Sequence, residues 1–165
     1  MNNLISFLNT TDDTNFKQNI RNYIPFERTL DSMIYSWFIC AGDNFAKNIL
    51  WATYDGIKWM PSVYDLDGTW GMMYDGIRYY TATTFLPDII MQQYNTNLLW
   101  IRLYDNFKEE IKDRYFDLRK SILTNEHISE VFSNFFNKIP EIIKETDLKV
   151  WPETPDPSKN TINQI

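Results

Sequence analysis

A short β-hairpin is the firmest structural prediction that this sequence allows. Two runs rich in aromatic and β-branched residues, 49–54 and 57–64, are separated by Asp55-Gly56. An Asp-Gly pair between such runs favours a two-residue type I′ turn. With this turn, Asn48 would face Val63 across the hairpin. The rest of the chain must then be arranged around one small antiparallel ribbon.

Helical patterns lie on both sides of the predicted hairpin. Before it, we expect short helices around 4–8 and 15–23 and a longer helix over 27–40, because apolar residues recur there every three or four positions. After it, Pro140 fits the first turn of another short helix. Residues 74–97 show no clear period and are expected to be irregular, and 160–165 resemble a helix start. Two apolar stripes predict helix faces: Phe107, Ile111, Tyr115, Leu118 and Ile122, and then Ile128, Val131, Phe132, Phe135 and Phe136. We expect Phe132, Phe135 and Phe136 to belong to the core, unless a truncated lobe exposes them.

These patterns predict an α+β fold that is mainly α-helical. The chain has 165 residues, of which 44% are hydrophobic, enough for one domain with its own core over 1–165. Both ends of the sequence look like cuts through something larger. We therefore expect a single domain that is a fragment of a longer protein.

Composition excludes several classes of function. Sixteen basic against 22 acidic residues give a net charge of -6, which argues against a general nucleic-acid binder. The only cysteine, Cys40, and the only histidine, His127, exclude a disulfide framework, a thiolate zinc site and a multi-histidine metal site. No apolar run approaches the roughly 20 residues that span a bilayer. No signal peptide is visible at the N-terminus.

Polar residues flank the open end of the predicted hairpin. Asp43 and Asn48 precede its first strand, and Asp65 and Asp67 follow its second. Because neighbouring strands lie roughly 5 Å apart, we expect these four side chains to gather, with Lys47 as the only cation among them. Carboxylate and amide oxygens suit Mg²⁺, Mn²⁺ or Ca²⁺ better than zinc. The pattern predicts metal-assisted phosphate chemistry with one aspartate available as a base.

The order of these residues is that of a protein kinase active site. There, a catalytic Asp is followed five residues later by an Asn, and a hairpin leads to a metal-binding Asp next to Gly. The chain also resembles the spore coat protein H (CotH) kinase family, including its phage and prophage variants. The resemblance covers roughly residues 20–165 and is carried by 41–48, 58–61, 64–71 and the helix at 111–119.

This resemblance implies an atypical protein-kinase-like C-terminal lobe that transfers the γ-phosphoryl group of ATP to Ser or Thr of a protein partner. Asp43 matches the catalytic acid, Asn48 the metal-binding amide, and either Asp65 or Asp67 the metal-binding carboxylate. The implied cofactors are Mg²⁺ or Mn²⁺, with ATP as co-substrate. Neither a glycine-rich loop nor a strand lysine precedes Asp43, so the nucleotide-binding N-lobe is expected to be missing and the fragment incomplete as an enzyme.

Two other functions stay open. One is a non-catalytic structural or attachment module of a phage tail or bacterial surface, built on a kinase-like scaffold. The other is a domain whose divalent ion is purely structural. The partner would be a phage tail, spore or surface protein, and the location the bacterial cytoplasm, a virion or a spore. Single residues also have purely structural interpretations. The aspartates can be ordinary turn residues, and Trp51, Trp59 and Trp70 can pack in the core. Cys40 is expected to be a buried inert thiol and His127 a surface residue.

Overall fold

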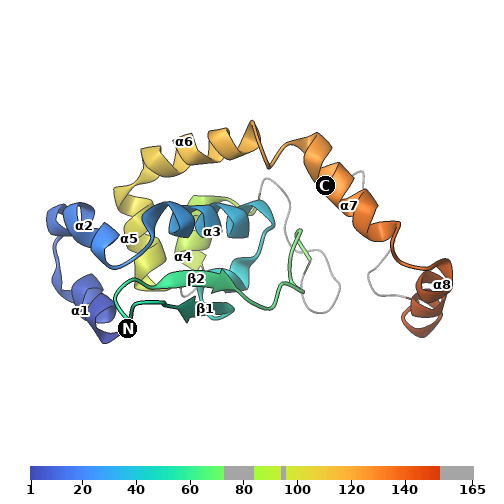
Figure 1. The fold of residues 1–165 in the computed structure, drawn as a ribbon, viewed down its shortest axis with the longest axis horizontal. Helices are drawn as coiled ribbons and strands as arrows, with labels where there is room; N and C mark the ends of the chain where they lie inside the picture. The colour runs from blue at the N-terminus through green and yellow to red at the C-terminus, as the bar shows by residue number, and fades with distance from the viewer. Residues whose placement is uncertain (73–83, 94–95, 153–165) are drawn as a thin grey trace.

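The described residues form helices that pack beside one small hairpin, which lies at the edge of the body (Figure 1). The computed structural model describes residues 1–72, 84–93 and 96–152. The predicted fold class, α+β and mainly helical, is confirmed. In chain order the elements are α1 (Asn2–Thr10), α2 (Asp13–Asn19), the 3-10 helix η1 (Ile20–Asn22), α3 (Phe26–Phe38), the 3-10 helix η2 (Gly42–Phe45), β1 (Ile49–Ala52), β2 (Met60–Val63), α4 (Pro87–Gln93), α5 (Leu98–Asn106), α6 (Lys108–Arg119), α7 (Asn125–Phe136) and α8 (Glu141–Val150).

The hydrophobic core is built around α3. Leu30, Met33 and Ile34 recur at three- and four-residue spacing, and all three are buried. Figure 1 shows α3 between the hairpin on one side and α6 on the other. The core also takes in buried residues of α1, α2, α5 and α6, among them Phe7, Phe16, Trp100, Leu103 and Ile111. The N-terminal region is therefore helical, as the sequence predicts.

The hairpin is present, but its predicted turn and register are wrong. Ile49 faces Val63 and Ala52 faces Met60, one position away from the register of a two-residue turn. The connection is the longer loop 53–59. The Asp55 carboxylate causes this difference because its Oδ1 accepts the backbone N–H groups of Ile57 and Lys58, both at 2.8 Å.

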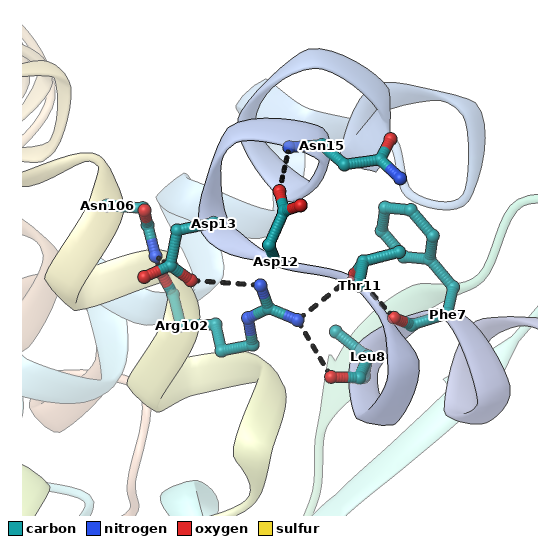
Figure 2. Close-up of polar contacts among 8 residues, drawn as sticks. All are labelled: Phe7, Leu8, Thr11, Asp12, Asp13, Asn15, Arg102 and Asn106. Carbon is teal, nitrogen blue, oxygen red and sulfur yellow. Dashed lines mark hydrogen bonds and ion pairs between the residues drawn. The ribbon is translucent and has the colours of Figure 1, made fainter.

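A buried arginine joins the α1–α2 junction to α5 (Figure 2). Arg102 of α5 is 8% exposed. It donates to the Leu8 carbonyl at 2.8 Å and to Thr11 Oγ1 at 3.1 Å, and it pairs with Asp13 Oδ1 at 2.9 Å. Its guanidinium also lies 4.3 Å from the centre of the Phe16 ring. One side chain thus fixes the α1–α2 junction against α5.

One helix lies where the sequence predicts irregular structure. α4 falls inside the stretch 74–97. α5 directly follows this stretch, where the helical pattern is expected to return. Asn97 caps α5 by accepting the Trp100 N–H at 3.3 Å. α4 is held by Ile90, which is fully buried. The predictions for 74–83, 94–95 and 160–165 lie outside the described residues.

The last two helices form an arm that leaves the body, here called the C-terminal arm (residues 125–151) (Figure 1). Neither α7 nor α8 contains a buried residue. The expectation that Phe132, Phe135 and Phe136 belong to the core is therefore wrong, and the exposed alternative holds, because each is about half exposed or more. An amphipathic pattern shows which face is apolar but not whether anything covers it. Among the described helices, none is long and apolar enough to span a bilayer.

Candidate functional site

The candidate site begins in the tight turn that follows α3. The carbonyl of Asp43, in η2, accepts the N–H groups of Ala46, Lys47 and Asn48 at 3.1, 2.9 and 3.0 Å. Three bonds to one carbonyl close the chain into a compact loop. The carboxylate of Asp43 stays accessible, with its side chain 45% exposed. The loop thus presents an acid at the surface on a fixed backbone.

Asn44 fastens this loop to the far strand of the hairpin. Its side chain is 2% exposed, and its Nδ2 donates to the Asn48 carbonyl and, at 3.2 Å, to the Tyr64 carbonyl. The Tyr64 N–H in turn donates to the Asn48 carbonyl at 3.2 Å. Sequence reasoning did not single out Asn44. Its only sequence signal is its place directly after Asp43, inside the motif.

The hairpin brings Asn48 and Asp65 together. Asn48 Nδ2 lies 3.5 Å from Asp65 Oδ2, although 17 positions separate the two residues. Asp65 has a φ of 56°, in the left-handed region that aspartate enters more readily than most residues. The observed register places Asn48 beside Tyr64, not opposite Val63 as predicted. The side chains of Asn48 and Asp65 meet despite this shift in register.

Lys47 supplies the positive charge among these acids. Its Nζ lies 3.0 Å from Asp43 Oδ2. This hydrogen bond, followed by the charge of Asp43 and then those of Asp65 and Asp67, raises the pKa of Lys47 above its usual value. The ammonium therefore stays charged at neutral pH. Lys47 pairs with Asp43 and offsets one of the three negative charges.

Asp67 is exposed, and its Oδ1 accepts the N–H of Gly68 at 2.8 Å. No group of three or more His, Cys, Asp or Glu residues that could hold a metal ion is found within the part of the chain that the structure describes. The three predicted aspartates therefore do not converge on one point. Magnesium commonly takes only one or two protein carboxylates and leaves its other positions to water and phosphate. The amide oxygen of Asn48 and the carboxylate of Asp65 are oxygen ligands of the kind that Mg²⁺ binds.

The aromatic side chains near the site serve packing. Trp51 and Trp59 are partly buried against the core, as predicted, and the ring centres of Trp51 and Trp100 are 5.9 Å apart. Trp70 packs edge to face on both Phe38 and Phe132. Cys40 is half-buried, short of the fully buried thiol that was expected. His127 is exposed, as predicted.

A helical domain with an acid-bearing loop, an amide and a metal-type carboxylate on one hairpin has the motif order of a kinase-like protein. Comparison with protein families is consistent with that class. The family model described as CotH kinase protein matches residues 1–164, and the chain belongs to this family. No curated protein and no solved structure matches the chain. Membership supports a kinase-like domain and, in general terms, the use of ATP and a divalent ion.

Proposed function

We propose that this domain takes part in phosphoryl transfer from ATP to Ser or Thr of a protein partner, as the catalytic-loop and metal-binding part of an atypical kinase. The observation that carries the proposal is the 3.5 Å contact between Asn48 and Asp65, next to the Asp43 loop. Asn48 with Asp65 or Asp67 would hold Mg²⁺ or Mn²⁺. The partner would be a phage tail, spore or surface protein.

Each side chain has a definite task in this proposal. Asp43 would orient the attacking hydroxyl and accept its proton, since its carboxylate is accessible. A hydroxyl must compete with Lys47 for Asp43 Oδ2 or bind the other carboxylate oxygen. When bound, the divalent ion would neutralise charge on the phosphates. Asn44 would keep the Asp43 loop at a fixed distance from the hairpin.

The strands that cover a nucleotide in a kinase must come from elsewhere in this proposal. The described residues before Asp43 are helical, and β1 and β2 are the only strands that form a sheet in the described ranges. We propose that another part of the parent protein supplies the nucleotide lobe. Full turnover would then belong to the parent, because kinases position phosphates with both lobes.

Thermal unfolding with millimolar MnCl₂ and ATP tests the site. A ligand that binds only the folded state raises the melting temperature. We expect a rise for the native chain and little or none for Asp65→Asn. Asp67→Asn shows which of the two aspartates holds the ion. The matched control is Asp113→Asn, which removes the same charge from an exposed position on α6 and should keep the native response.

No rise in the native chain would contradict nucleotide and metal binding by this domain. In the complete parent protein, Asp43→Asn should abolish phosphate incorporation into the partner. Equal incorporation by the native protein and this variant would exclude the role given to Asp43.

The second candidate is a non-catalytic attachment module on the same scaffold. It is favoured by the helical character of the described residues before Asp43. This function predicts no response to ATP with Mn²⁺. A purely structural ion predicts a response to Mn²⁺ alone that ATP does not increase. The thermal titration therefore separates all three functions.

A further inference from the structure

The loop 65–71, which carries Asp65 and Asp67, leaves the hairpin at the end of β2. Inside the loop, Thr69 Oγ1 donates to the Leu66 carbonyl at 3.0 Å. This bond joins two residues of the same loop, so it fixes the shape of the loop and not its position on the body. The position of the two carboxylates therefore depends in part on how the far end of the loop is held.

Trp70 anchors that far end. Its backbone N–H donates to the carbonyl of Ile39, at the end of α3. Its ring packs edge to face on Phe38 of α3, with ring centres 5.7 Å apart, and on Phe132 of α7, with ring centres 5.2 Å apart. The indole is thus clamped between two helices that are far apart in the sequence.

The backbone of the loop is strained at both ends. Trp70 has a φ of 56°, in the left-handed region that a bulky residue rarely enters. Asp65 has the same φ of 56°. Conformations of this kind persist only where the surrounding contacts hold them. The contacts of the Trp70 ring therefore help to keep the acid-bearing loop in its observed form.

The outer half of the clamp belongs to α7. The start of α7 is fixed to α6, because Arg119 donates to the Leu123 carbonyl and, at 2.9 Å, to Asn125 Oδ1. Phe132 follows two turns later and is 48% exposed. A cavity of about 220 Å³, which Phe132 and Trp70 both line, lies beside the indole. This space gives the indole room to shift once the Phe132 ring is removed.

A shift of the indole would move Asp67 more than Asp65. Asp67 stands only three residues before Trp70 in the loop. Asp65 directly follows Tyr64, whose N–H donates to the Asn48 carbonyl at 3.2 Å. The hairpin therefore holds Asp65, whereas the place of Asp67 depends more on the clamp.

We propose that Trp70, clamped between α3 and α7, is a positioning residue of the cation site, and that α7 thereby sets the affinity of this site for the divalent ion. The inference rests on the proposed function, since it takes Asp65 or Asp67 as a ligand of the ion. It gives α7 a task in addition to packing. The contact between Phe132 and Trp70 regulates the loop on which the acids lie.

Isothermal titration calorimetry of the full chain with Mn²⁺ and ATP, well below the unfolding transition, tests this coupling. Groups that orient metal ligands commonly contribute about tenfold or more to metal affinity. Trp70→Leu should therefore raise the dissociation constant about tenfold. Phe132→Ala removes one of the two rings of the clamp and should raise it about threefold or more. Phe132→Tyr keeps the ring and should restore the native value.

The matched control is Phe135→Ala on the same helix. Phe135 is 67% exposed and is not among the described residues that line the cavity, so its loss should leave the dissociation constant unchanged. Denaturant unfolding of each variant measures stability separately. A purely structural role of Phe132 would lower the stability of the chain and leave the affinity of the folded state as it is.

The outcomes separate this inference from the proposed function. If the native chain binds Mn²⁺ and ATP and Phe132→Ala binds them equally well, the inference is overturned and the proposed function stands. Equal weakening by Phe132→Ala and Phe135→Ala would also overturn it, because the effect would then not depend on contact with Trp70. A native chain that does not bind contradicts the proposed function and, with it, this inference.

Discussion

Asn44 shows how one buried side chain can hold a loop that carries chemistry. Its amide bonds two carbonyls, those of Asn48 and Tyr64, which belong to opposite strand ends. Removing it takes a donor from both carbonyls and leaves a gap at a position where Asn44 itself is only 2% exposed. Such a loss costs more than the net value of an ordinary surface hydrogen bond.

Asn44→Ala should therefore lower the free energy of unfolding by about 2–3 kcal/mol. It should also reduce the thermal response to Mn²⁺ and ATP, because the Asp43 loop is no longer fixed to the hairpin. Denaturant unfolding measures the first effect. Asn3→Ala, at an exposed position in α1, is the control and should change stability by less than about 0.5 kcal/mol. Equal stability of the native chain and Asn44→Ala would contradict this role.

The side chains of the candidate site could be predicted only where a motif names them. Asp43, Asn48, Asp65 and Asp67 were selected by residue type and spacing, and the structure brings Asn48 and Asp65 into contact. Asn44 could not be selected in this way. Its importance comes from a carbonyl twenty positions away, and such a partner is visible only after folding.

The α1–α2 junction is held by a charged hydrogen bond between Arg102 and Asp13. The hydrogen bond from Arg102, then that from Asn106, lowers the pKa of Asp13 below its usual value of 3.8. The folded state therefore binds this proton less readily than the unfolded state. The resulting stability is fully present above about pH 3.8 and is lost as the pH falls through the lower folded-state value.

Asp13→Asn should remove this part of the pH dependence. At pH 6 the variant should be less stable than the native chain, and the difference should shrink as the pH falls below 3.8. Urea midpoints at several pH values measure it. Asp113→Asn on α6 corrects for the loss of one charge. A difference between the native chain and Asp13→Asn that is the same at pH 3 and pH 6 would show that Arg102 does not act through ionised Asp13.

Elements with a regular spacing of apolar residues could be predicted from the sequence. Elements whose position depends on the hydrogen bonds of one side chain could not. The stripes of α3 and α6 identify both helices from sequence because repeated apolar residues define a face. The hairpin loop differs from its prediction because the Asp55 carboxylate binds two N–H groups. α5 begins after the cap residue Asn97, and its residues Leu99, Trp100 and Leu103 are buried in the core.

Within the described residues, the helical body and the C-terminal arm differ in how much of their apolar surface is buried. The body surrounds fully buried residues such as Met33 and Trp100. The arm meets it at α7, beside a cavity of about 220 Å³ lined by α3 residues such as Phe38 and by Val131 and Phe132 of α7. Neither helix of the arm has a buried residue, so the arm gains less stability from apolar burial than the helices of the body do. The sequence could not predict this, because it shows an apolar stripe without its partner.

Amide hydrogen exchange should therefore divide the chain into two parts. Amides of α3 and α5 should exchange only through global unfolding, whereas those of α8 should exchange through local opening that costs little free energy. At low protein concentration we expect α8 to be the least protected helix among the described ones. Protection of α8 equal to that of α3 in dilute solution would show that the arm is held by the body itself.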